Sequence, residues 1–172
     1  VHFRDTVIGG RFINDQRLVD VFTREAPDRV LEMEEFGIGW DKKGDKFEQG
    51  WMPGHSYPRS LHVDWRTGTH FSQALQREMK KSPRVKVMNF MFVTDLIRSE
   101  GKVGGAFAIN MIKGTFVVLR AKATVVATGG GMYLYDVNSG SYESTGDGFA
   151  YAYRVGAQLM DMEFVQIFPA CM

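Results

Sequence analysis

Residues 121–162 read AKATVVATGGGMYLYDVNSGSYESTGDGFAYAYRVGAQLMDM, and this stretch carries the pattern that decides the fold. It opens with an apolar, β-branched run at 123–128, which predicts a buried strand in a sheet covered on both faces. A glycine triplet follows at 129–131, and consecutive glycines let a backbone contact a ligand because no Cβ atoms intervene. The stretch therefore predicts a strand that ends in a glycine turn.

A second motif, S-T-G-D-G at 144–148, precedes a run rich in alanine and aromatic residues. Ser144, Thr145 or Asp147 can cap a helix there, and Gly156 can end it. A helix N-terminus behind a glycine-rich loop presents free N–H groups and a positive dipole end, which suits a phosphate. Strand, glycine turn and helix also follow one another in α/β proteins without a phosphate site, so the spacing alone leaves both interpretations open.

Three motifs are specific because they occur together and in order. They are V-V-A-T-G-G-G at 125–131, S-T-G-D-G-F-A-Y-A-Y-R-V-G-A at 144–157 and D-M-E-F-V-Q-I-F-P at 161–169. Their order and spacing resemble those of the FAD-binding flavoproteins of the succinate dehydrogenase, fumarate reductase and L-aspartate oxidase family. The resemblance implies FAD as cofactor and an α/β fold, part of a Rossmann-like FAD-binding domain with flanking helices and an inserted antiparallel β-meander.

The resemblance also implies where FAD would lie. Asp147 matches the aspartate of T-G-D-G, which lies at the FAD site in the family. Residues 128–130 match the segment near the pyrophosphate, and residues 92–93 match the strand whose backbone passes the adenine. Together, the implied cofactor-binding residues are Thr128, Gly129, Gly130, Asp147, Phe92 and Val93.

The third motif bears on the substrate. Glu163 and Gln166 are implied to flank the substrate edge of the flavin. The family's D-M-E-x-x-Q-F-H-P has a histidine in contact with a dicarboxylate, whereas this chain has Phe168 at that position. Phenylalanine neither donates a hydrogen bond nor carries charge, and losing one charge-assisted donor costs about 1.5–3 kcal/mol of binding. Phe168 weakens the assignment of succinate or fumarate and leaves the FAD assignment intact.

A loop at 54–62, G-H-S-Y-P-R-S-L-H, holds two histidines and an arginine. No third ligand at zinc spacing lies nearby, so we predict no metal site. The loop resembles G-G-H-S-x-x-R-x-x-H of the L-aspartate oxidase branch, with Pro53 in place of the first glycine. This implies that Arg59 and His62 lie close to the substrate. The alternative, that His55, Arg59 and His62 tie down a long loop by hydrogen bonds, stays open.

The remaining elements follow from local patterns. Residues 1–84 are expected to be mainly helical, 85–120 to form the β-meander, and 121–172 to form a strand, a glycine-rich loop and a helix. Asn14 and Asp15 can cap a helix that Pro27 divides in two, with Gly37 ending the second part. Ser82 and Pro83 are expected to end a later helix. The expected core positions of the first two helices are Leu18, Phe22, Val30, Leu31 and Phe36.

Composition narrows the class of protein. The chain has 172 residues, 44% of them hydrophobic, and a formal net charge of +1, which is typical of a globular domain and gives no indication of nucleic-acid binding. Its single cysteine, Cys171, allows no internal disulfide and cannot hold an iron–sulfur cluster alone. No apolar run reaches membrane-spanning length. We expect a cytoplasmic protein, alone or peripheral on the inner face of the membrane through a partner subunit.

The dinucleotide fingerprint G-x-G-x-x-G is absent from the chain. The resemblance implies that it lies upstream, because family members carry it before their segment D-T-V-x-G, which Asp5, Thr6 and Val7 match here. We therefore expect an internal portion of a longer flavoprotein, without the N-terminal fingerprint or the substrate-capping domain, and inactive alone. The intact protein is expected to transfer hydride between FAD and a small carboxylate, and its expected partner is an iron–sulfur subunit. Two alternatives stay open: a different substrate in the same family, or a non-enzymatic assembly or relic domain.

Overall fold

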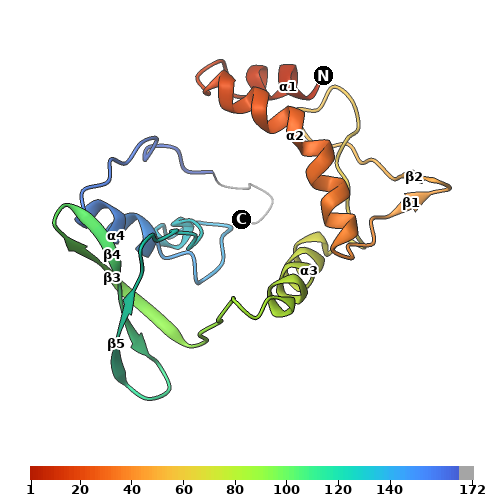
Figure 1. Ribbon diagram of the computed structural model, residues 1–172. Helices are drawn as coiled ribbons and strands as arrows, with labels where there is room; N and C mark the ends of the chain where they lie inside the picture. The colour runs from red at the N-terminus through yellow and green to blue at the C-terminus, as the bar shows by residue number, and fades with distance from the viewer. Residues whose placement is uncertain (167–172) are drawn as a thin grey trace. The chain divides into compact units, whose positions relative to one another are not determined.

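The computed structural model of the chain describes residues 1–166. Two compact units are formed, Val1–Lys86 and Val87–Met172. The first contains α1 (His2–Gly9), α2 (Gln16–Glu35), β1 (Lys42–Lys43), β2 (Lys46–Phe47) and α3 (Thr67–Lys81), as Figure 1 shows. The second contains β3 (Met91–Ser99), β4 (Lys102–Asn110), β5 (Thr115–Arg120), the 3₁₀ helix η1 (Met132–Leu134) and α4 (Asp147–Arg154). Within the described residues, no helix has the length and apolar character that crossing a membrane requires.

Helix α2 is continuous, so the predicted division at Pro27 is wrong. Asp15 caps the helix as expected, because its carboxylate accepts a hydrogen bond from the Arg17 N–H at 2.9 Å. Proline removes one backbone donor, and the turns on either side of Pro27 supply enough hydrogen bonds to carry the helix through. A further helix, α1, precedes it.

The core of the first unit forms around Ile38, Trp40, Val63 and Ala74, all of which are buried. Val30 and Phe36 pack against this cluster, as predicted. For three other residues the prediction of a core position is wrong, because Leu18 is 68% exposed, Phe22 is 59% exposed and Leu31 is 50% exposed. Helix α2 is covered at the buried Val19, near α1, and at the residues that pack on the core cluster, whereas Leu18, Phe22 and Leu31 lie outside these covered positions.

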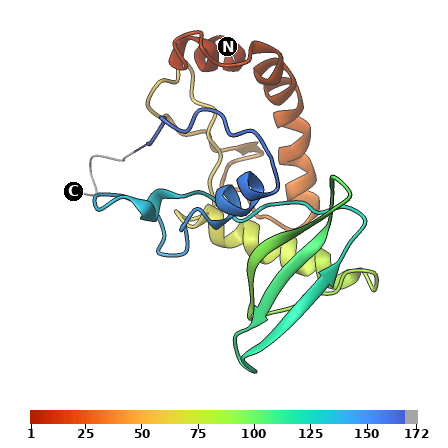
Figure 2. The same ribbon diagram turned by 90° about the vertical axis from the view of Figure 1, so that its left-hand side faces the viewer.

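The second unit is built on an antiparallel meander in which β4 pairs with β3 and with β5. This meander was predicted, and Figure 2 shows its three strands side by side. Glu100 and Gly101 join β3 to β4, and both have positive φ, 51° and 78°, as in the turns that match the twist of a hairpin. Helix α4 packs against β3.

One expectation for the second unit differs from the structure. Residues 123–128 form no strand, and Val125 is 89% exposed. A buried strand needs hydrogen-bonded neighbours and covering layers, and no segment among residues 1–166 pairs with this run. The apolar pattern is therefore present without the partners that would make it a strand.

Candidate functional site

The glycine triplet and the start of α4 lie together in the second unit. The N–H of Gly146 donates to the Gly130 carbonyl at 3.2 Å, and the N–H of Tyr133 donates to the Ser144 carbonyl at 3.0 Å. These bonds join the two motifs that are more than a dozen residues apart in sequence. The predicted glycine-rich loop and helix N-terminus therefore form one local structure.

Helix α4 begins with Gly146 as its N-cap in the left-handed conformation, φ 72°. The predicted side-chain cap is wrong, because no side chain of the described residues caps the helix. Asp147 instead lies in the first turn, where a carboxylate complements the helix dipole, and its Oδ2 accepts from Thr145 Oγ1 at 2.6 Å. Gly156 follows the helix with φ 99°, so its role as the stop is confirmed.

The glycines of this site divide into open and crowded positions. A Cβ at Gly129 or Gly130 would meet no atom within 4 Å. A Cβ at Gly148 would lie 2.1 Å from Thr128 Oγ1, and one at Gly131 would lie 3.3 Å from the Gly146 Cα. The crowded glycines let the loop and α4 approach each other, while the open pair leaves backbone facing free space.

The same two segments contain unpaired backbone donors. Among the described residues, the N–H groups of 129–131 have no hydrogen-bond partner, and neither do those of Asp147 and Gly148 at the start of α4. Unpaired N–H groups at a helix N-terminus beside an open glycine loop are suited to an anion such as a phosphate. The arrangement fits a pyrophosphate-bearing cofactor.

Five of the predicted site residues line three cavities of the second unit. Gly130 and Gln166 line one of about 320 Å³, and Asp147 lines another of about 280 Å³. Thr128 and Val93 line a third of about 340 Å³. Glu163 is exposed and Phe92 is 47% exposed; successive strand residues face opposite sides, so Phe92 does not share the cavity of Val93. Phe168 lies outside the described residues.

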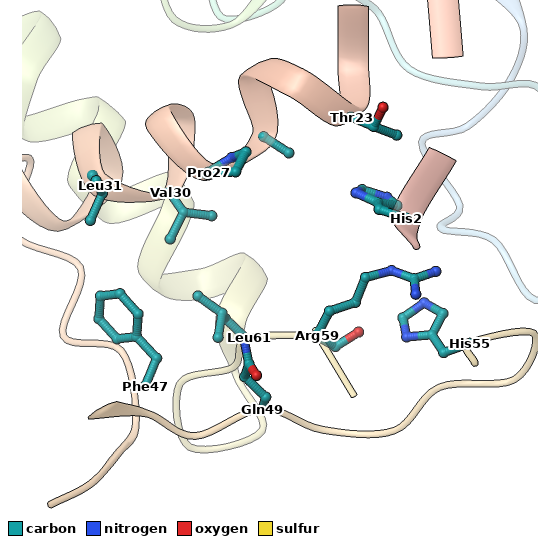
Figure 3. Close-up of a pocket in the computed structure, with 12 residues that line it drawn as sticks. His2, Thr23, Pro27, Val30, Leu31, Phe47, Gln49, His55, Arg59 and Leu61 are labelled. Atoms are coloured by element: carbon teal, nitrogen blue, oxygen red, sulfur yellow. The ribbon is translucent and has the colours of Figure 1, made fainter. Parts of the chain in front are cut away.

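The first unit has a cleft of about 560 Å³ of its own, drawn in Figure 3. Arg59, His2 and His55 gather at one end of it, and apolar side chains from α2 and from the facing loop line the rest. The apolar lining residues are Ala26, Pro27, Val30, Leu31, Phe47 and Leu61. The cleft thus combines a polar end with an apolar body, the usual character of a small-molecule site.

Arg59 is held by Asp5 of α1. Its Nη1 donates to Asp5 Oδ2 at 2.6 Å, and the Ser56 N–H donates to the same oxygen at 2.9 Å. The Ser56 hydroxyl donates to Asp5 Oδ1 at 2.7 Å. The hydrogen bonds from Ser56, followed by that from Arg59, hold the pKa of Asp5 well below its usual range. This geometry favours the loop-anchoring interpretation of Arg59 while leaving it beside the cleft.

His62 lies apart from the cleft, since it is not among the lining residues. Its Nδ1 is 2.7 Å from Asp41 Oδ2, which also accepts from the Asp64 N–H at 3.0 Å. The Asp64 N–H first, and His62 second, lower the pKa of Asp41. The ring of Trp65 stacks on His62 with centroids 6.0 Å apart. Asp41 thus joins His62 to the backbone of Asp64 in the segment before α3, and the substrate-proximal assignment of His62 remains a prediction.

Sequence reasoning missed the part that His2 plays in the cleft. Burial, and then the neighbouring Arg59 and His55, lower the pKa of His2, so its ring is neutral near pH 7. The Nδ1 atom of His55 is buried without a hydrogen-bond partner among the described residues. Spacing along the chain gives no signal for this cluster, because about fifty residues separate His2 from the other two side chains. Within residues 1–166, no three His, Cys, Asp or Glu side chains lie close enough to hold a metal ion.

The stability of the protein should fall with acidification, and more steeply than exposed carboxylates alone would cause. A carboxylate whose pKa is lowered by folding stabilises the protein above its unfolded pKa, and this contribution is lost as pH falls through the folded pKa. For Asp5 and Asp41 the loss begins below about pH 5. His2, which folding keeps neutral, adds a loss that begins nearer neutral pH.

Urea unfolding between about pH 7 and pH 2.5 measures this effect. Asp5→Asn and Asp41→Asn should each flatten the profile below pH 5, whereas Asp20→Asn, which removes only an exposed ion pair with Arg24, should keep its slope. A profile of unchanged steepness in both variants would contradict the role of these carboxylates.

Comparison with known proteins shows the family to which the chain belongs. The family model described as "FAD binding domain" matches residues 1–172. The chain is 38% identical, over its whole length, to a protein of Methanothermobacter marburgensis named as a subunit of fumarate reductase (CoM/CoB), of which it covers 31%. It is 35% identical to the fumarate reductase flavoprotein subunit of Escherichia coli, with 98% of this chain and 28% of that protein covered. The chain thus spans less than a third of the length of these relatives.

Solved structures of related proteins are also similar to this chain. The chain is similar, with a TM-score of 0.92 and 35% identity, to an E. coli quinol fumarate reductase flavoprotein variant, over 96% of this chain and 28% of that one. It is similar, with a TM-score of 0.90 and 41% identity, to Sdh1 of Mycobacterium smegmatis in complex with UQ1, over 96% of this chain and 30% of that one. Both structures are similar to nearly the whole of this chain in sequence and in fold.

Proposed function

Because this chain belongs to the FAD binding domain family, we propose that the intact protein is an FAD-dependent oxidoreductase of the fumarate reductase and succinate dehydrogenase type. The observation that carries the proposal is the pair of open glycines beside the α4 N-terminus, with unpaired N–H groups around them. A phosphate fits such a place because backbone donors and the helix dipole both favour negative charge.

The residues around the glycine loop would bind FAD at its pyrophosphate and at the edge of the flavin. Thr128, Gly129 and Gly130 would contact the pyrophosphate of FAD through their backbone, and Asp147 would lie at the same site with its carboxylate fixed by Thr145. FAD supplies the redox chemistry when bound, by exchanging a hydride with a substrate. Gln166 lines the same cavity as Gly130, which supports a place for it at the edge of the flavin.

For the substrate we propose a small carboxylate. Arg59 is permanently charged, borders a cleft, and uses one N–H of its guanidinium on Asp5 within the described residues. The relatives include fumarate reductase subunits, for which a carboxylate is implied by name. Phe168, in place of the family's histidine, favours a second candidate, an enzyme of this family with another substrate. Turnover of fumarate or L-aspartate would argue against that candidate.

Partners and location are part of the same proposal. Solved relatives are components of complexes described with a quinone or menaquinol. We therefore propose that the partner is an iron–sulfur subunit, and that the protein lies peripherally on the inner face of a membrane. A non-enzymatic assembly role remains the contrasting hypothesis, and a full-length protein that purifies without flavin colour would favour it.

Gly130→Ala in the full-length protein tests the FAD site by its bulk alone. The added methyl group meets no protein atom within 4 Å, so the fold should be unaffected, whereas a pyrophosphate in contact with this backbone would be displaced. We expect FAD affinity to fall about tenfold or more, which corresponds to at least 1.4 kcal/mol. Flavin absorbance per protein after dialysis measures the loss.

Gly104→Ala is the matched control, because its Cβ also meets nothing within 4 Å and it lies in β4. It should keep its flavin. Asp147→Ala is the companion variant and should also lose flavin, since the carboxylate at the site is removed. Flavin content equal to wild type in both Gly130→Ala and Asp147→Ala would remove these residues from the binding site.

A further inference from the structure

We propose that Asp5 is a positioning residue, which fixes the loop at 55–60 and thereby orients the Arg59 guanidinium at the polar end of the cleft. The proposal deepens the proposed function, because it depends on that function for the role of Arg59 toward a carboxylate. Asp5 itself does not line the cleft, so it acts through Arg59 and not on a ligand directly.

The contacts of Asp5 all converge on one loop. Both carboxylate oxygens are used: Oδ1 accepts from the Ser56 hydroxyl, and Oδ2 accepts from the Ser56 N–H and from Arg59 Nη1. The partners lie 51 and 54 positions along the chain, so local sequence does not hold them together. One carboxylate therefore fixes the loop backbone and its arginine at the same time.

The surroundings make this contact stronger than an ordinary surface ion pair. The Asp5 side chain is 8% exposed and that of Arg59 is 18% exposed, so water screens the pair weakly. Asp5 also lies within helix α1, which gives the carboxylate a rigid base. Hydrogen bonds between ionised groups are shorter and stronger than neutral ones, which fits the 2.6 Å separation here.

Backbone hydrogen bonds also hold the two ends of the loop at 50–60 together. Gly50 and Ser60 form a bridge in which the Gly50 N–H donates to the Ser60 carbonyl at 2.8 Å, and the Arg59 N–H donates to the Gly50 carbonyl at 3.3 Å. The backbone of Arg59 is thus held at one side and the loop tip at the other by Asp5. What remains free is the rest of the guanidinium, whose other N–H groups have no partner in the part of the chain that the structure describes.

Asp5 affects an anionic ligand in two opposite ways, because it neutralises the charge of Arg59 and also fixes the direction of its guanidinium. Arg59 and Asp5 together are neutral, so this ion pair adds no net charge to the polar end of the cleft. A site of this kind recognises an anion by the fixed direction of its donors more than by long-range attraction. Removing Asp5 would add net positive charge but release the guanidinium, and we expect the loss of orientation to dominate.

The first measurement is hydrogen exchange of the full-length, FAD-loaded protein without substrate. Asp5→Asn should raise the exchange rate of amides in the loop at 55–60 about tenfold, because the charged anchor of Ser56 and Arg59 is lost. Asp20→Asn, the same substitution in an exposed ion pair with Arg24, should leave that loop unchanged. Unaltered exchange in Asp5→Asn would overturn the proposal, whatever the substrate proves to be.

The second measurement is the binding and turnover of fumarate by Asp5→Asn, Arg59→Gln and the double variant. Asp5→Asn should raise KM about tenfold with kcat changed less, and the double variant should resemble Arg59→Gln alone, because Asp5 acts through Arg59. Additive effects, or tighter fumarate binding in Asp5→Asn, would overturn the positioning role. If Arg59→Gln leaves KM unchanged while the loop exchange rises in Asp5→Asn, the proposed function of Arg59 fails and the loop anchor stands.

Discussion

The full-length protein with Gly148→Ala should lose most of its bound FAD and become less stable at the same time. Gly148 is the second residue of α4, and a Cβ there would lie 2.1 Å from Thr128 Oγ1 and 3.2 Å from Val126 Cγ1. Rotating the Thr128 hydroxyl aside relieves only part of this clash, because Val126 Cγ1 and the Thr128 Cβ, at 3.5 Å, stay close; we therefore expect the first turn of α4 to move away from the glycine loop. That movement separates the unpaired N–H groups that we propose for the pyrophosphate.

The magnitude follows from two opposing effects. Alanine is favoured over glycine inside a helix by about 1 kcal/mol, whereas forcing a methyl group into a packed contact costs about 1–3 kcal/mol. We expect the clash to dominate because the Val126 contact at 3.2 Å remains whichever rotamer Thr128 adopts. We expect FAD affinity to fall more than about tenfold, and a flavin absorbance titration with a parallel urea unfolding curve measures both losses.

Two variants make this result interpretable. Gly68→Ala is the matched control, because Gly68 is also the second residue of its helix, α3, and its Cβ would meet nothing within 4 Å. It should keep its flavin and gain slightly in stability. Combining Thr128→Ala with Gly148→Ala removes the clashing oxygen and should recover part of the affinity. Full FAD occupancy in Gly148→Ala alone would contradict the packing of α4 on the loop.

The second large effect is expected for Gly105→Ala in β4, which should cost about 3–5 kcal/mol of stability. A Cβ there would lie 1.9 Å from the Leu119 carbonyl oxygen and 3.1 Å from the Arg120 Cα, both backbone atoms of β5. Gly105 also has φ 146°, a conformation that side chains rarely adopt. Because backbone atoms cannot rotate aside, the ladder between β4 and β5 must open.

Urea unfolding of the protein gives the change in stability, and hydrogen exchange shows whether it is local to residues 115–120. Gly104→Ala is the control, since Gly104 precedes Gly105 in the same strand and its Cβ would meet no atom within 4 Å. A loss below about 1 kcal/mol in Gly105→Ala would show that the meander tolerates a shift of β5.

The meander was predictable because its information is local. Alternating apolar residues and a glycine turn indicate a hairpin without reference to the rest of the chain, and Glu100 and Gly101 form that turn. Helix α4 and its stop at Gly156 were predictable for the same reason. The strand expected at 123–128 was not formed, because an apolar run specifies burial and leaves the choice of partner to other segments.

In the candidate site, too, local contacts were predictable and contacts between distant segments were not. The proximity of Gly130 to the start of α4 followed from motif order, since a loop and the helix after it are neighbours in α/β folds. The contact between Asp5 and the loop at 55–60 was not predictable, because its partners are 51 and 54 positions away. Core membership on α2 was overpredicted for Leu18, since helical periodicity gives a face and not the extent of what covers it.

The topology of the meander also bears on how the chain reaches its fold. Its strands pair only with their neighbours in the sequence, β3 with β4 and β4 with β5, and the turns between them are short. Contacts between residues close in sequence form fast, because little loop-closure entropy is lost. During synthesis, residues 91–120 can therefore pair before the glycine loop and α4 have been made. We expect the emerging chain to present a finished sheet, against whose strand β3 helix α4 then packs.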